Sequence, residues 1–280
     1  MNVRQALITA ANPHQRSLPL QILIDRDGVT RSALEIVLRE AAGAGIERFC
    51  VVVCPGDEIA YAEACGPYRA QTEFAVQPEP RGYGDAILRG REPMGEDPFL
   101  HLVGDHIHLS DATASCARQL LDVAAAEKTC VSAVQSTHES QLTSFGAVGG
   151  KLLGGDLPLY EIEAVLEKPT PTIAEQELLV PGMRAGFYLC FFGLHVLDQQ
   201  IFELLEAEQT AAPDEKLGLS SALHRLAGHR RYLALNLAGR RYDIGAHYGL
   251  LNAQLALSLG GKDRDQVMAQ IIELLGQTTR

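Results

Sequence analysis

Residues able to bind or transform a ligand gather at four places in the sequence, the first three of them beside an expected strand end. In an open α/β sheet, ligands bind beyond the carboxyl ends of the strands, so these turns predict a site for polar ligand chemistry. Each turn alone is also typical of an ordinary loop or helix cap, and their joint order carries the signal. The places are 11–19 (ANPHQRSLP), 77–86 (QPEPRGYGDA), 104–105 (GD), and a later set at 167–169, 214–215 and 243–245.

Other kinds of catalytic site lack their sequence patterns. Nucleophilic hydrolysis by a Ser-His-Asp triad has no G-x-S-x-G elbow here, and a dinucleotide-binding enzyme needs G-x-G-x-x-G after the first strand. Three histidines, His101, His106 and His108, lie close together in the sequence. Their spacing fits no usual zinc site, so we expect hydrogen-bonded or surface roles for them.

Composition excludes several classes of protein. The chain has 280 residues, 46% of them hydrophobic, which is typical of a globular protein. Lys and Arg total 24 against 35 Asp and Glu, and this net charge of -11 repels nucleic-acid backbones, so no nucleic-acid partner is expected. The longest apolar stretch, 185–194, is far shorter than the ~20 residues of a membrane span. The six cysteines form no C-x-x-C, which predicts buried free thiols in a cytoplasmic protein.

Strand and helix patterns alternate in the first half of the chain. This rhythm predicts a three-layer α/β/α fold around a mostly parallel sheet. Ser32 and Asp111 are expected to cap two of its helices. The expected strands are 6–11, 49–54, 72–77, 99–103 and 130–135, and the expected helices are 33–43, 57–65, 85–91 and 111–127.

The rhythm changes after residue 140, yet no linker divides the chain. We therefore expect a single domain, 1–280, with a first half at 1–140, a second half at 141–262 and a C-terminal helix at 263–280. An apolar stripe on the last helix, carried by Val267, Ile271 and Leu274, predicts either docking on its own domain or self-association into a homo-oligomer. In the second half the expected strands are 145–149, 160–166 and 186–192, and the expected helices are 196–208, 219–226 and 245–259.

The order of these motifs resembles the bacterial UTP–glucose-1-phosphate uridylyltransferases, within the sugar-nucleotidyltransferase family. The likeness spans roughly residues 3–260 and implies a Rossmann-like nucleotidyltransferase fold with a small β-rich sugar-binding extension. It is carried by 40–46 (EAAGAGI), Gln77 with 82–86 (GYGDA), 104–105 (GD), 145–148 (FGAV), 167–169 (EKP), 185–188 (AGFY), 214–215 (DE) and 243–245 (DIG).

The resemblance also implies a reaction and a set of site residues. A sugar-1-phosphate, which is glucose-1-phosphate in this branch, attacks the α-phosphorus of UTP to give a UDP-sugar and pyrophosphate. Mg²⁺ offsets the developing charge and usually takes one or two carboxylates, here Asp105 and Asp243. By the same resemblance, the nucleotide is bound by Ala11, Gln77, Gly82 and Asp105, the sugar by Gly146, Glu167 and Gly186, and the phosphates by the catalytic cations Arg16 and Lys168.

The first turn departs from the family pattern. The family carries a Gly-rich loop of the form G-x-G-T-R followed by Pro-Lys, whereas this chain has 12–16 (NPHQR), then Pro19-Leu20, and no lysine before Lys128. Pro13 supplies no N–H donor, and only Arg16 matches. Two functions therefore stay open: a uridylyltransferase, and a catalytically silent relative that binds a sugar nucleotide or regulates a partner subunit.

Overall fold

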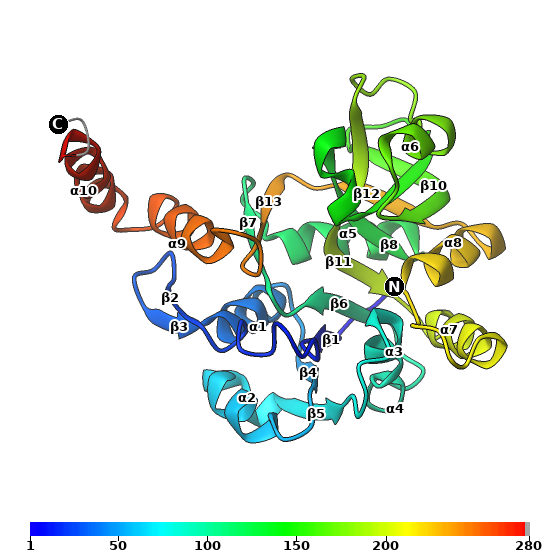
Figure 1. Cartoon of the computed structure of the whole chain (residues 1–280), viewed down its shortest axis with the longest axis horizontal. Helices are drawn as coiled ribbons and strands as arrows, with labels where there is room; N and C mark the ends of the chain where they lie inside the picture. Colours follow the sequence, from blue (N-terminus) through cyan, green and yellow to red (C-terminus); the bar gives the residue numbers. More distant parts are fainter. Residues whose placement is uncertain (278–280) are drawn as a thin grey trace.

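One nine-stranded sheet runs through the molecule (Figure 1). The computed structural model describes residues 1–277. The sheet has the order β5-β4-β1-β6-β11-β8-β12-β10-β9. It combines strands from both halves of the sequence, because β12 lies between β8 and β10. Its strands are β1 (Gln5–Thr9), β4 (Arg48–Val53), β5 (Thr72–Val76), β6 (Phe99–Val103), β8 (Val131–His138), β9 (Gly146–Leu152), β10 (Leu159–Glu167), β11 (Phe187–Leu197) and β12 (Leu233–Asn236).

The first four strands of the chain to enter this sheet form the parallel part that the sequence predicts. β1 pairs with β4 and β6, and β4 pairs with β5, all in parallel. The apolar runs of β1, β4 and β6 are buried on both faces, as strands covered by helices on each side require, whereas β5 at the edge of the sheet is only partly buried.

The rest of the sheet corrects the expectation of a mostly parallel fold. β11 runs antiparallel between β6 and β8. Within residues 1–277, the sheet has four parallel and five antiparallel pairings. Apolar runs show that a strand is buried but not its direction, because both orientations bury the same side chains.

Helices cover both faces of the sheet, and neighbouring residues of a strand pack into different cores. Ala6 and Ile8 join one core and Leu7 the other. The first core includes side chains of α1 (Ala33–Gly43), α2 (Glu58–Ala64), α5 (Cys116–Glu127) and α9 (Gly249–Leu259). The second includes side chains of α3 (Tyr83–Leu88), α4 (Arg91–Met94), α7 (Gln200–Ala211) and α8 (Ser220–His229).

A third, smaller core lies beside the later strands. It contains Leu142, Ala147, Ala174, Leu178, Tyr188 and Cys190, from β9, β11 and the short helical segments η2 (Glu139–Ser144) and α6 (Pro171–Glu177). All six cysteines are buried and unpaired, as predicted.

Several element boundaries differ from those expected, and the helix expected from residue 245 begins at Gly249. Asp111 does not cap α5. Ser115 does, because its Oγ accepts the Arg118 N–H at 3.2 Å. The helix expected from residue 196 begins instead at Gln200, since β11 continues through Leu197. Ser32 caps α1 as predicted, with its Oγ 2.9 Å from the Glu35 nitrogen.

Five short strands and several short helical segments were not predicted. β2 (Ile22–Ile24) and β3 (Thr30–Ser32) form a hairpin, and β7 (His106–Ser110) pairs with β13 (Gly239–Asp243) as a separate antiparallel ribbon. β12, within the main sheet, is the fifth. The helical segments include the 3₁₀ turns η1 (Gly66–Gln71) and η2 and the helix α6.

The last helix, α10 (Arg264–Gln277), lies at the end of the molecule away from the sheet (Figure 1). It packs against α9 and has no buried residue. Val267 and Ile271 are half-buried, whereas Ile272 and Leu274 are 63% and 61% exposed. Across residues 1–277, no helix is long and apolar enough to cross a membrane.

Candidate active site

A cavity of about 780 Å³ lies at the carboxyl ends of the parallel strands, where the sequence places its chemistry. Residues following β1, β5 and β6 line it, among them Ala11, Gln77 and Asp105. Segments far along the chain complete the wall. The sequence-predicted residues that line it are Ala11, Gln77, Gly82, Asp105, Gly146, Glu167, Lys168 and Asp243.

Asp105 and Asp243 converge although 138 positions separate them in the sequence. β7 pairs with β13 in a register that sets His106 opposite Asp243, and the Ile244 N–H donates to the Asp105 carbonyl at 3.0 Å. Ligand atoms of Asp105, His106 and Asp243 lie within 4.8 Å of one another. Asp243 Oδ1 also accepts the Gly245 N–H at 2.8 Å, which fixes its carboxylate. This group could hold one divalent metal ion.

The side-chain amide of Gln77 is fixed by two acceptors inside the protein. Its Nε2 donates to the Gly82 carbonyl at 3.0 Å and to Asp85 Oδ2 at 2.7 Å. Gln77 is 5% exposed and Asp85 is 1% exposed. Because the amide nitrogen is committed to these two oxygens, Oε1 is the atom left to meet a ligand, and it can only accept a hydrogen bond.

Gly82 is required by contact with the loop before α8. Its φ is 115°, and a Cβ there would lie 2.3 Å from the Leu217 carbonyl oxygen. The Leu217 N–H donates to the Arg81 carbonyl, and its own carbonyl accepts the Gly84 N–H, both at 2.8 Å. This pairing also brings Lys216 to the cavity wall. Lys216 was not among the predicted site residues, although it lies directly after the 214–215 motif.

The opposite wall of the cavity is built around Glu167 and Gly146. Glu167 Oε2 accepts from Ser220 Oγ at 2.6 Å. A Cβ on Gly146 would lie 2.9 Å from the Phe191 ring and 3.1 Å from Glu167 Oε2, so any side chain would displace that pair. Lys168 has a positive φ of 48°, which is uncommon outside glycine and concentrates at functional sites.

A second unpredicted cation, Arg241, also lines the cavity. Its guanidinium lies 3.9 Å from the centre of the Phe145 ring and donates to the Phe191 carbonyl. Burial lowers the pKa of Arg241 from its ordinary value. Arg241 precedes Asp243 by two residues on β13, so the two side chains lie on one side of that strand. Only the unpredicted β7–β13 pairing reveals that this side faces the cavity.

Two predicted site residues lie elsewhere. Arg16 does not line the cavity, because it forms a two-point ion pair with Asp57, with Nε 2.8 Å from Oδ2. Gly186 also lies outside the lining, and the side chain nearest to it is that of Glu139. Sequence order placed both residues near the site, but the ion-pair partner of Arg16 could not be foreseen.

The turn after β1 closes on itself. The His14 N–H donates to Asn12 Oδ1 at 3.1 Å, and the Gln15 N–H donates to the Asn12 carbonyl at 3.0 Å. None of residues 11–19 has a positive φ. These N–H groups are thus used inside the turn, and phosphate groups in the cavity must be met chiefly by side-chain cations.

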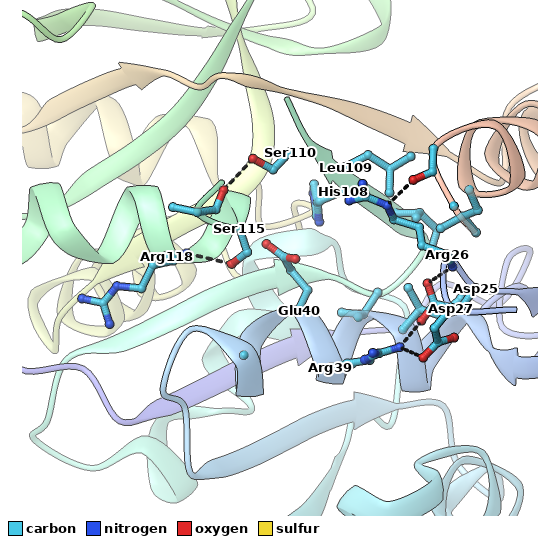
Figure 2. A pocket seen from close by; sticks show the side chains of 18 of the residues that line it. Asp25, Arg26, Asp27, Arg39, Glu40, His108, Leu109, Ser110, Ser115 and Arg118 are labelled. Carbon is cyan, nitrogen blue, oxygen red and sulfur yellow. Dashed lines mark hydrogen bonds and ion pairs between the residues drawn. The ribbon is translucent and has the colours of Figure 1, made fainter. Parts of the chain in front are cut away.

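A different cavity, of about 710 Å³, lies between α1, β7 and the loop after α9 (Figure 2). Its acidic groups are already used by this chain. Arg39 lies 2.7 Å from both Asp25 and Asp27, as Figure 2 shows. Glu40 accepts the Ala117 N–H at 2.8 Å, and burial raises the pKa of Glu40. We therefore assign the chemistry to the first cavity.

Comparison with known proteins agrees with this geometry. The sequence matches the nucleotidyl transferase family over residues 27–258, most of the chain. The chain belongs to the nucleotidyl transferase family.

Individual relatives match this nucleotidyl transferase along nearly its whole length. UTP–glucose-1-phosphate uridylyltransferase YngB of Bacillus subtilis is 28% identical, covering 99% of this chain and 97% of the relative. UTP–glucose-1-phosphate uridylyltransferase 2 of Streptococcus pyogenes is 26% identical over 97% of this chain and 96% of its own.

Solved structures share the fold. The UDP-glucose pyrophosphorylase from Acinetobacter baumannii has a TM-score of 0.77 at 21% identity, covering 98% of this chain and all of its own. A UDP-glucose pyrophosphorylase complexed with UDP-glucose has a TM-score of 0.75 at 20% identity, covering 91% and 98%.

Proposed function

We propose that this nucleotidyl transferase joins UTP and glucose-1-phosphate to form UDP-glucose and pyrophosphate. The observation that carries the proposal is the convergence of Asp105 and Asp243 on the cavity that Lys168 and the oriented Gln77 also line. The full-length relatives named as UTP–glucose-1-phosphate uridylyltransferases support the choice of substrates.

Gln77 selects the base. Uracil carries an N–H at N3, whereas cytosine presents a lone pair at that position. The fixed Oε1 of Gln77 accepts from the first and repels the second. Ala11 and Gly82 form the walls beside the base, since neither carries a side chain large enough to block it.

The sugar lies against the wall that Glu167 and Gly146 form. Glu167, oriented by Ser220, accepts hydrogen bonds from sugar hydroxyls. Gly146 leaves the space that a side chain would take from that pair. Gly186 was expected in this wall by resemblance, and its place outside the cavity removes it from the proposed contacts.

The phosphates meet side-chain cations and a metal ion. Lys168, Lys216 and Arg241 supply positive charge around the cavity, in place of the Gly-rich loop and of Arg16. Asp105 and Asp243 are the residues that hold Mg²⁺. When bound, Mg²⁺ neutralises charge that develops on the phosphate oxygens. Lys168 holds the sugar phosphate so that its oxygen faces the α-phosphorus of UTP.

The proposal extends to the organisation of the protein. The chain acts as one domain in the cytoplasm, where its six unpaired thiols stay reduced. It forms a homodimer through α10. α10 packs against α9 but leaves Ile272 and Leu274 exposed, and a second copy that covers these side chains stabilises it.

Calorimetric titration tests the proposed ligands. Wild-type protein should bind UTP in the presence of Mg²⁺ and should bind UDP-glucose, and CTP should bind more weakly than UTP. Lys168→Ala should weaken binding of UDP-glucose, which carries the sugar phosphate, and leave the fold intact by circular dichroism. Binding of UDP-glucose alone, with no Mg²⁺-dependent binding of UTP, would identify a silent relative instead.

A further inference from the structure

His106 stands beside the two carboxylates proposed to hold the metal. Its Nδ1 lies 2.7 Å from Asp105 Oδ1, and the β7–β13 register sets it opposite Asp243. The side chains of Asp105 and His106 are 15% and 14% exposed, so both sit in the cavity wall, shielded from bulk water.

The imidazole ring has little freedom to turn away. A Cβ on Gly193, whose φ is 83°, would lie 3.6 Å from His106 Cδ2, so β11 flanks the ring on one side. His108 stacks near it with ring centres 6.4 Å apart. The ring is therefore held with Nδ1 toward Asp105, without needing a metal ion to place it.

The donor set combines one imidazole nitrogen with two carboxylates. Mg²⁺ prefers oxygen ligands, whereas imidazole nitrogen favours transition metals such as Co²⁺ and Zn²⁺. Two carboxylates alone form a site for a hard cation. Adding a nitrogen shifts the relative affinity toward softer divalent ions.

We propose that Nδ1 of His106 is a third metal ligand, so that this site binds Mn²⁺ and Co²⁺ more tightly, relative to Mg²⁺, than Asp105 and Asp243 alone would. Ligation uses the tautomer with its proton on Nε2, and the Nδ1–Asp105 hydrogen bond gives way to two bonds to the metal. The inference rests on the proposed metal site of the nucleotidyl transfer reaction.

Electron paramagnetic resonance of Mn²⁺ bound to the full chain, without nucleotide, tests it directly. Electron spin echo modulation should show a directly bound ¹⁴N in the wild type and lose it in His106→Asn. Labelling with ¹⁵N-histidine should replace the ¹⁴N frequencies in the wild type. These readouts need no catalysis.

Calorimetry with Co²⁺ and Mg²⁺ gives the second readout. His106→Asn should reduce the ratio of Co²⁺ affinity to Mg²⁺ affinity at least tenfold, on the scale of about 10–100-fold that lost support of a metal ligand produces. Asp243→Asn should weaken the binding of both ions. The variant's fold is checked by circular dichroism, and the wild-type spectrum stands even if the variant unfolds.

The outcomes separate this inference from the proposed function. No nitrogen coupling in the wild type, with metal binding still lost in Asp243→Asn, would overturn the role of His106 and leave the metal site standing. Metal binding unaffected by Asp243→Asn would overturn both the metal site and the inference.

Discussion

Asp85 controls which face of the Gln77 amide meets the base. Its Oδ2 accepts from Gln77 Nε2 at 2.7 Å, and the pair is almost fully buried. In Asp85→Asn, the new amide can donate to Gln77, so only the Gly82 carbonyl still holds the Gln77 N–H₂ in place, and Gln77 can turn this N–H₂ toward the cavity in part of the molecules. An N–H₂ group donates to the N3 lone pair of cytosine, so discrimination between UTP and CTP should fall.

The size of the effect follows from the bond that is lost. A hydrogen bond to a charged group contributes about 1.5–3 kcal/mol. At about 1.4 kcal/mol per factor of ten, the ratio of kcat/KM for UTP to that for CTP should fall by roughly 10- to 150-fold. The assay measures pyrophosphate release from each nucleotide with saturating glucose-1-phosphate.

Arg89→Gln is the matched control. Arg89 is ion-paired with the other oxygen of Asp85, so both variants remove that ion pair, but only Asp85→Asn alters the acceptor of Gln77. Arg89→Gln should lower stability and leave the UTP preference within a few-fold of wild type. An unchanged UTP preference in folded Asp85→Asn would refute this account of base selection.

Three further predictions concern other parts of the molecule. Arg16→Ala should keep kcat/KM within about threefold, because Arg16 pairs with Asp57 outside the cavity. Lys168→Ala should lower turnover by about 10²–10³, and equal losses in both variants would contradict the site. Burial lowers the pKa of His101 from 6.5 to about 4. Between these two pH values the imidazole is protonated in the unfolded state and neutral in the folded state. The free energy of unfolding of the wild type should therefore fall by about 2 kcal/mol more than that of His101→Gln when the pH is lowered from 7 to 5. Urea denaturation of both proteins at both pH values measures this difference. Ile272→Glu should convert the proposed dimer to a monomer in light scattering, and a wild-type monomer would refute the role of α10.

The parallel strands could be predicted because uninterrupted runs of apolar residues indicate buried segments. β4 (Arg48–Val53) is buried at every position after Arg48, and such a run has few alternatives in a globular chain. The direction of β11 could not be predicted, since antiparallel insertion between β6 and β8 depends on its path through space and leaves its apolar pattern unchanged.

The candidate site was predictable where a motif lies at a strand end. Asp105 and Gln77 follow β6 and β5, and the sheet itself brings those ends together. His106 was passed over because its importance depends on pairing with Asp243, far away in the sequence, through a ribbon of five-residue strands. Arg16 was expected at the cavity, but its guanidinium pairs with Asp57 outside the cavity.

The central claim is that this cavity transfers a uridylyl group. Phosphorus NMR of purified wild-type protein with UTP, glucose-1-phosphate and Mg²⁺ tests it most directly, since UDP-glucose and pyrophosphate give separate signals. We expect both products in equal amounts, at a rate on the order of 1–10³ s⁻¹, and a loss of at least a hundredfold in Lys168→Ala. No pyrophosphate from wild-type protein that still binds UDP-glucose would contradict the account.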